Sequence, residues 1–238
     1  MAMEIRPFES THRGVALNHL LAILREGYPQ PAVLVFPTFA GRGDLELAAA
    51  ERLADQGVIG VAVDLYGGGR RGATREECAA LMKPFMEDRA FLRDRLLHVL
   101  EAVKAVGDID AERIGAIGFC FGGLCALDLA RSGAAIRCTA SFHGLLKPNG
   151  LPPEPIGGKV AVYHGADDPM APPSDVEALA QELTAAGADW QIQAYQGVMH
   201  GFTNPAANDP EAGIRYDQAA AERSWASLEA LLSECFSR

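Results

Sequence analysis

The sequence has no long hydrophobic run and no excess of positive charge. Its longest apolar stretches, such as Ala32–Phe36 and Val58–Val63, have the length of core strands and are far shorter than a membrane span. The N-terminal segment carries Glu4, Arg6 and Glu9 and no apolar region, so no secretory signal is visible. The formal net charge of -10 disfavours nucleic acid, because phosphates require a basic surface. We therefore expect a cytoplasmic protein with neither a membrane nor a nucleic acid as its partner.

Paired cysteine motifs and metal-ligand motifs are also missing. No CxxC pair and no HExxH segment occurs, which disfavours a thioredoxin-type site, a zinc knuckle and a metalloprotease. An odd, scattered set of cysteines without a secretory signal predicts reduced thiols. We expect neither a metal nor another cofactor. The five cysteines are Cys78, Cys120, Cys125, Cys138 and Cys235.

What the chain does contain is a regular alternation of strand-like and helix-like segments. The 238 residues are 49% hydrophobic and 22% charged, and no repeat or low-complexity linker divides them. We therefore expect one domain over residues 1–238. Strands are predicted at Ala32–Phe36, Val58–Asp64, Arg113–Phe119, Cys138–Phe142, Lys159–Tyr163 and Trp190–Tyr195. Helices are predicted at Leu45–Gln56, Gly122–Arg131, Pro173–Ala186 and Tyr216–Cys235, with one or two more between Arg75 and Val106.

This order predicts the fold class and the place of the site. Alternating helices and nearly all-apolar strands are typical of an α/β fold, in which helices cover both faces of a mostly parallel central sheet. Ala16–Leu24 precedes any crossover helix and is expected to be an antiparallel edge strand. Ligand sites in such folds lie at the carboxyl ends of the strands, so we look for chemistry directly after each strand.

The segment after the strand Arg113–Phe119 has the pattern of a nucleophile elbow. Residues Gly118–Gly123 read G-F-C-F-G-G, with cysteine where most elbows carry serine. Cys120 is then expected at a helix N-terminus, which favours the thiolate, and the backbone N–H of Phe121 becomes an oxyanion donor. The alternative is that Cys120 is a small buried residue in a glycine-rich turn.

A cysteine elbow needs a histidine and an orienting acid further along the chain. The order nucleophile, acid, histidine selects His200, which follows the last strand, from the six histidines of the sequence. The acid is expected after the strand Lys159–Tyr163, where Asp167 and Asp168 are adjacent. We favour Asp168, which precedes a proline-rich turn, whereas Asp167 is suited to cap that turn.

With these segments the sequence resembles the dienelactone hydrolase family. The resemblance implies an α/β-hydrolase fold and a triad of Cys120, His200 and Asp168 that opens a cyclic enol-lactone. It also implies the N–H of Phe39 as the second oxyanion donor. The matching segments are Ala32–Gly41, Val61–Tyr66, Gly118–Gly123, Gly165–Pro172 and His200–Phe202.

Two positions depart from the pattern of the family. Thr38 stands where the family has a glutamate that assists the cysteine, and threonine cannot take up a proton. Of the two arginines that hold the substrate carboxylate, Arg75 matches one, and Asn204 stands at the position of the other. The resemblance therefore supports the fold and the triad better than it supports dienelactone as the substrate.

The reading that fits these residues best is a hydrolase of small carboxylic esters or lactones, with phosphotriesters as a side activity. Phe39, Phe119, Phe121 and Phe202 are candidates for an apolar pocket, although any of them is equally suited to the core. The alternative is a catalytically silent hydrolase fold that binds or senses a small ligand. The expected partner is a small-molecule substrate, and the protein is expected to be a monomer or a homodimer.

Overall fold

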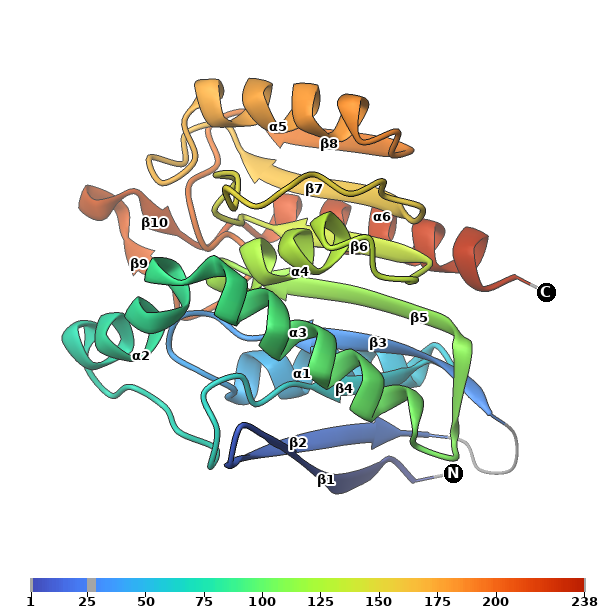
Figure 1. Ribbon diagram of the computed structural model, residues 1–238. Helices are drawn as coiled ribbons and strands as arrows, with labels where there is room; N and C mark the ends of the chain where they lie inside the picture. Colours follow the sequence, from blue (N-terminus) through green and yellow to red (C-terminus); the bar gives the residue numbers. More distant parts are fainter. Residues whose placement is uncertain (1, 25–28, 238) are drawn as a thin grey trace. The chain divides into compact units, whose positions relative to one another are not determined.

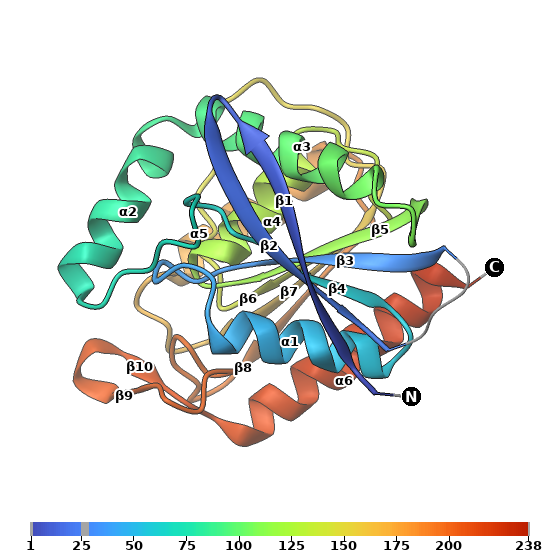
Figure 2. The same cartoon turned by 90° about the horizontal axis from the view of Figure 1, so that it is seen from below.

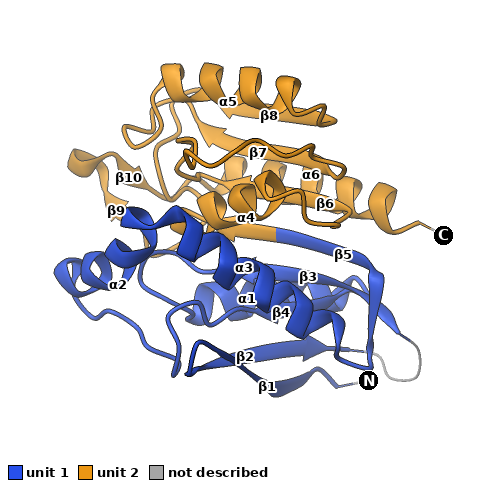
Figure 3. Cartoon of the chain, in the orientation of Figure 1, with its two compact units in different colours: residues 1–116 blue, residues 117–238 orange. Residues whose placement is uncertain are grey.

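The computed structural model describes residues 2–24 and 29–237. The chain divides into two compact units, residues 1–116 and residues 117–238 (Figure 3). Strand β5 (Ile109–Phe119) begins in the first unit and ends in the second. The expectation of a single domain over residues 1–238 stays a prediction.

The first unit holds four further strands in the order β1-β2-β4-β3. β1 (Glu4–His12) and β2 (Val15–Ile23) form an antiparallel hairpin, and β2 also pairs antiparallel with β4 (Ile59–Ala62). β4 pairs parallel with β3 (Gln30–Phe36). The expected antiparallel strand is therefore present, but its expected place at the edge is wrong, because β1 pairs along its outer side. β1 was not predicted, since its residues are mostly polar and exposed.

Three helices accompany these strands. α1 (Asp44–Asp55) packs on β2, β3 and β4, and it comes so close to β4 that a Cβ at Gly60 would lie 2.2 Å from the carbonyl oxygen of Ala50. α2 (Arg75–Glu87) and α3 (Arg89–Lys104) resolve the predicted helical segment into two helices. They meet at Asp88, whose carboxylate caps α3 by accepting the N–H of Phe91 at 2.8 Å.

The second unit carries the parallel strands β6 (Cys138–Phe142), β7 (Lys159–Gly165) and β8 (Trp190–Tyr195) side by side (Figure 1). β6 and β8 have the bounds that the sequence predicts. α4 (Phe121–Arg131) precedes β6, and α5 (Pro173–Ala185) connects β7 to β8. The unit ends with the short strands β9 (Asn208–Asp209) and β10 (Ile214–Arg215), the 3-10 turn η1 (Pro210–Ala212) between them, and helix α6 (Gln218–Phe236).

The two faces of the parallel strands in this unit meet different helices (Figures 1 and 2). Val160 and Val162 of β7 join an apolar cluster with residues of α4 and α5. Successive side chains of a strand point to opposite faces, so Tyr163 lies on the other face, where its hydroxyl reaches Ser227 of α6 at 3.3 Å. The strand ends of β5, β6 and β7 lie at one edge, which is where the candidate site is found.

No helix within residues 2–24 and 29–237 is long and apolar enough to cross a membrane.

Candidate active site

The site is built on a sharp turn between β5 and α4. Cys120 occupies this turn with φ 56° and ψ -116°, a conformation that residues with a side chain rarely adopt. Glycine on either side makes the turn possible. A Cβ at residue 118 would lie 2.0 Å from the carbonyl oxygen of Gly122, and a Cβ at Gly123 would lie 2.6 Å from Ser141 Oγ. The backbone crossing at this point therefore excludes any side chain at Gly118.

The turn is also fixed by hydrogen bonds within the second unit. The N–H of Cys120 donates to the carbonyl oxygen of Phe142 at 3.1 Å, and the carbonyl oxygen of Cys120 accepts the N–H of Gly123 at 3.0 Å. Phe121 is the first residue of α4, so the half-buried Cys120 lies at the positive end of the helix dipole. N–H groups of a first helical turn are suited to bind an oxyanion, which is the role expected for Phe121.

His200 and Asp168 lie in hydrogen-bonding contact. His200 Nδ1 is 2.8 Å from Asp168 Oδ2, and both side chains are buried. The second carboxylate oxygen, Asp168 Oδ1, accepts the N–H of Met170 at 2.8 Å. Asp167 is exposed, and its backbone N–H donates to the carbonyl oxygen of Val198 at 2.9 Å. Of the two adjacent acids it is Asp168 that contacts the imidazole, and the same residue also closes the turn.

The loop that carries His200 is held by a hairpin that sequence reasoning missed. The N–H of His200 donates to Gly213 O at 2.9 Å, and the carbonyl oxygen of His200 accepts the N–H of Arg215 at 3.0 Å. These bonds form a bridge between His200 and Ile214 of β10. The hairpin of β9 and β10 is too short and too exposed to leave a periodic pattern in the sequence, although Gly213 at φ 72° marks its turn.

A second buried histidine supports His200. The ring of His143, directly after β6, meets the ring of His200 edge-on at 5.1 Å between centroids and the ring of Phe202 at 5.2 Å. His143 Nε2 is 2.8 Å from Thr203 Oγ1. Sequence reasoning did not show this contact, because it depends on how the segment after His200 folds back.

The charges of the site place a proton on His200. Burial of His200 disfavours its cationic form, but the charge of the Cys120 thiolate and the hydrogen bond to Asp168 outweigh burial and raise the pKa of His200 to about 10. Burial, together with the positive charge of His200, lowers the pKa of His143 well below its usual range. His143 is therefore neutral next to a cationic His200.

Cys120 and His200 interact chiefly through charge in this state. His200 Nε2 is buried and makes no well-aligned hydrogen bond to any atom of the described residues, yet it is near enough to Cys120 for thiolate and imidazolium to attract each other. Catalytic hydrogen bonds are often long before substrate binds. A buried donor beside a thiolate is suited to hand a proton to a leaving group.

Two predicted pocket residues lie in the packing beneath the site. Phe119 is 1% exposed and its ring contacts those of Phe142 and Trp225, while Phe202 is fully buried. Asn204 is half-buried, and its side-chain oxygen accepts the N–H of Ala206 at 3.0 Å, which closes the loop after His200. The predicted roles of these three residues in substrate binding stay predictions.

Thr38, Phe39 and Arg75 belong to the first unit. The N–H of Thr38 donates to Glu46 Oε1 at 2.9 Å, and the N–H of Gly43 donates to the other oxygen of that carboxylate at 2.7 Å. Burial raises the pKa of Glu46, which these N–H groups partly offset. Glu46, which sequence reasoning missed, thus fixes the loop that carries the half-buried Phe39. Arg75 is exposed at the start of α2.

Among residues 2–24 and 29–237 there is no group of three or more histidine, cysteine or acidic side chains arranged to hold a metal ion.

Comparison with known proteins identifies the family. Residues 18–236 match the sequence profile of the dienelactone hydrolase family, so the chain belongs to this family. A solved structure named m3DLH is 36% identical, with a TM-score of 0.92 over 100% of both chains. The dienelactone hydrolase-like promiscuous phosphotriesterase P91 from metagenomic libraries is 33% identical, with a TM-score of 0.91 over 100% of both chains.

A curated relative extends this picture. A carboxymethylenebutenolidase homologue of Synechocystis is 29% identical over 216 residues, which is 84% of this chain and 85% of that protein. The expected α/β-hydrolase fold, with a mostly parallel sheet and helices, is confirmed by these comparisons, and so is the resemblance to the dienelactone hydrolase family. The protein is a hydrolase of this family.

The charge coupling between Cys120 and His200 gives a first prediction. In the wild-type protein, ring-nitrogen NMR of His200 should show the imidazolium up to a pH of about 10. In Cys120→Ser the thiolate charge is lost while burial remains, so the pKa of His200 should fall by roughly one to three units. Replacement of the buried Cys125 by serine, which leaves the elbow thiolate in place, is the matched control.

The same pair makes stability depend on pH. The pKa of His200 is higher in the folded than in the unfolded chain, so its stabilisation is complete below about pH 6.5 and is lost as the pH rises towards 10. The free energy of unfolding should therefore fall across this interval, and fall less in Cys120→Ser. A His200 that titrates identically in both proteins would show that no such ion pair exists.

Proposed function

We propose that this hydrolase cleaves small carboxylic esters or lactones through a cysteine nucleophile, Cys120, with His200 as proton donor and acceptor and Asp168 as the orienting acid. The observation that carries the proposal is the strained turn at Cys120, which holds its sulfur at a helix N-terminus beside a histidine whose pKa is raised to about 10. A cysteine that served only as packing would have no need of this turn.

The proposed reaction has two halves. The Cys120 thiolate attacks the carbonyl carbon, and the N–H groups of Phe121 and Phe39 stabilise the oxyanion. The intermediate collapses as the alkoxide leaves with the proton from His200 Nε2, and an acyl-thioenzyme remains. His200, now neutral, takes a proton from water, whose oxygen attacks the thioester. The acid departs, and thiolate and imidazolium are restored.

Asp168 and His143 keep the histidine in place through both halves. The carboxylate of Asp168 fixes Nδ1 of His200 as the hydrogen-bond donor, so that Nε2 carries the proton that moves. The neutral ring of His143 packs against His200 and leaves no competing charge beside it. We assign His143 as a positioning residue and not as a catalytic one.

Phosphotriesters are the proposed side activity. The relative P91 is described as a promiscuous phosphotriesterase and is 33% identical over the whole chain. A cysteine thiolate is also able to attack a phosphorus centre whose leaving group is good. Such a substrate would form a thiophosphoryl-enzyme in place of the thioester.

The alternative is a catalytically silent fold that binds a small ligand. The two proposals differ in one simple experiment, because alkylation of Cys120 with iodoacetamide should abolish turnover by an enzyme, whereas a binding protein has no turnover to lose. The raised pKa of the buried His200, to which charge at Cys120 contributes, favours the enzyme, since strongly shifted pKa values gather at catalytic sites.

The triad generates a second prediction. Cys120→Ala should reduce ester turnover to background, while the melting temperature shows an intact fold. His200→Ala should cost as much, and the double variant should be no worse than either, because the three residues act as a unit. Asp168→Asn should cost less, and Cys120→Ser should retain little activity. Turnover is measured with p-nitrophenyl acetate.

Cys125 provides the control, because it lies buried in α4 one turn beyond the elbow. Cys125→Ala should keep most of the activity of the wild-type enzyme. Wild-type rates in Cys120→Ala, or complete loss of activity in Cys125→Ala alone, would show that Cys120 is not the nucleophile.

Substrate choice generates a third prediction. Thr38 and Asn204 replace two charged groups that the family uses on dienelactone. A lost charge-assisted hydrogen bond costs roughly 1.5–3 kcal/mol, so the missing arginine should lower kcat/KM for cis-dienelactone about ten- to a hundredfold. p-Nitrophenyl acetate or a similar neutral aryl ester should therefore have the higher kcat/KM.

The methyl ester of the same lactone is the matched control, because it differs from cis-dienelactone chiefly in the charged carboxylate. Methylation should leave kcat/KM unchanged or raise it. A kcat/KM for cis-dienelactone well above that of every neutral ester would show that the carboxylate is held after all, and would direct attention to Arg70 and Arg71 beside Arg75.

A further inference from the structure

Two cysteines outside the active site lie close together in the second unit. Cys138 is the first residue of β6 and is 1% exposed, whereas Cys235 lies in the last turn of α6 and is half-buried. The two thiols lie close enough to shift each other's pKa through a side-chain interaction. The two residues are far apart in the sequence, so the fold alone brings them together.

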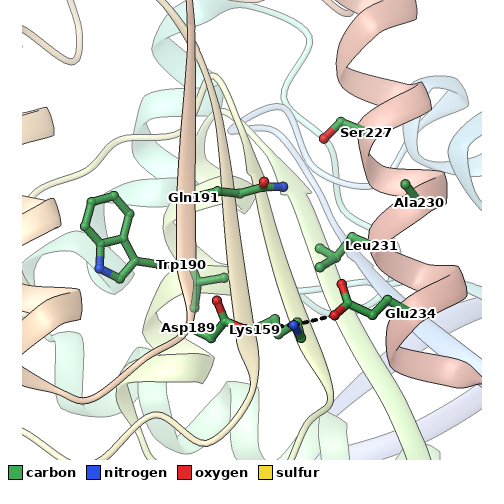
Figure 4. A pocket seen from close by; sticks show the side chains of 9 residues that line it. Lys159, Asp189, Trp190, Gln191, Ser227, Ala230, Leu231 and Glu234 are labelled. Carbon is green, nitrogen blue, oxygen red and sulfur yellow. Dashed lines mark hydrogen bonds and ion pairs between the residues drawn. The ribbon is translucent and has the colours of Figure 1, made fainter.

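The register of β6 and β7 helps to explain why Cys138 and Cys235 lie close together. Cys138 pairs with Lys159 and Phe142 pairs with Tyr163, so these four side chains share one face of the strands. α6 covers this face, since the ring of Phe142 meets that of Trp225 at 5.5 Å between centroids. At the other end of the strands, Lys159 Nζ binds Glu234 Oε1 at 2.6 Å (Figure 4).

The lengths of the two elements agree with this arrangement. From Phe142 back to Cys138 the strand covers four residues, or about 13 Å at 3.3 Å per residue. From Trp225 to Cys235 the helix covers ten residues, or about 15 Å at 1.5 Å per residue. α6 runs opposite to β6, and the contact between Phe142 and Trp225 at one end places Cys235 over Cys138 at the other.

The two thiols differ in their chemistry. The side-chain interaction with Cys138 lowers the pKa of Cys235, and Lys159 beside it favours the thiolate further, against the opposing effects of burial and of Glu234. The same interaction, together with burial, raises the pKa of Cys138. Cys235 is thus the more accessible and more nucleophilic thiol of the pair, and Cys138 is suited to be the resolving thiol.

We propose that Cys138 and Cys235 form a redox-responsive pair that hydrogen peroxide converts into a disulfide between β6 and α6. The Cys235 thiolate attacks one peroxide oxygen, the O–O bond breaks, and the product is the sulfenic acid of Cys235 with hydroxide, which takes up a proton to give water. Cys138 then attacks the sulfenic sulfur, the S–O bond breaks, and the thiol proton leaves with the hydroxyl group as a second water. Two thiols are oxidised by two electrons, and one peroxide is reduced.

A disulfide between Cys138 and Cys235 would anchor the C-terminal helix α6 to strand β6. It closes a long loop, residues 138–235, which contains both Asp168 and His200, and cross-links of long loops restrict the unfolded chain most. The anchored helix also carries Trp225, which packs against Phe119, the residue before Cys120. Formation of this disulfide is therefore expected to stabilise the packing of α6 beneath the site, and the disulfide does not involve Cys120.

The experiment uses the full chain with Cys120→Ser, so that its outcome does not depend on the proposed nucleophile. After treatment with hydrogen peroxide, peptide mapping without reductant should show a crosslink between the peptides of Cys138 and Cys235, with loss of two hydrogens. The melting temperature should rise by about 5 °C or more, and dithiothreitol should reverse the rise. Each of Cys235→Ser and Cys138→Ala, made in the same background, should remove both signals.

Cys78→Ser is the matched control, since Cys78 is buried in the first unit and has no part in the pair, so that this variant should behave as its parent does. Three results would overturn the proposal. The first is a Cys235 oxidised to sulfinic acid while Cys138 stays reduced. The second is a crosslink that involves other cysteines. The third is a rise in melting temperature that persists in Cys235→Ser.

Discussion

The strained backbone of Cys120 is the constraint from which the rest of the site follows. A residue with a side chain at φ 56° and ψ -116° costs of order 1–3 kcal/mol, which the surrounding structure must offset. The N–H of Cys120 is held by Phe142, and the strand before it crosses the helix after it so closely that Gly118 and Gly122 nearly touch. The turn leaves the thiol half-buried at the N-terminus of a helix.

Charge then decides where the proton rests. His200 is buried, and burial alone would keep it neutral, but negative charge at Cys120 on one side and the hydrogen-bonded Asp168 on the other raise its pKa to about 10. His143, which is buried next to it, has a pKa well below its usual range because burial disfavours its cationic form and the positive charge of His200 adds to this effect. The fold thus gives two histidines in contact different pKa values, so that one ring is charged and the other is neutral.

Several strands and the nucleophile elbow could be predicted from the sequence, because they depend on local sequence patterns. The runs Cys138–Phe142 and Trp190–Tyr195 are short and alternate apolar with polar residues, and both strands have the predicted ends. The elbow is recognisable because its glycines and cysteine are consecutive. The order of Asp168 and His200 after it is a property of chain topology.

What the sequence did not reveal depends on contacts between distant segments. β1 is polar and owes its place to its pairing with β2, and the hairpin of β9 and β10 is too short for any period to appear. Glu46 lies in helix α1, and its carboxylate accepts the N–H of Thr38 and so holds the loop. In the sequence a buried glutamate of a helix cannot be distinguished from an exposed one. Cys138 and Cys235 appeared scattered, since only the direction of α6 over β6 brings them together.

The most direct test of the account is the capture of the covalent intermediate. The enzyme is mixed with p-nitrophenyl acetate, quenched with acid at successive times and examined by mass spectrometry of the intact protein and of its peptides. The account predicts one acetyl group on the peptide that contains Cys120, formed within the burst of p-nitrophenol release and lost at the rate of steady-state turnover. Steady turnover with no acyl group on the protein, or with the group on any residue other than Cys120, would contradict it.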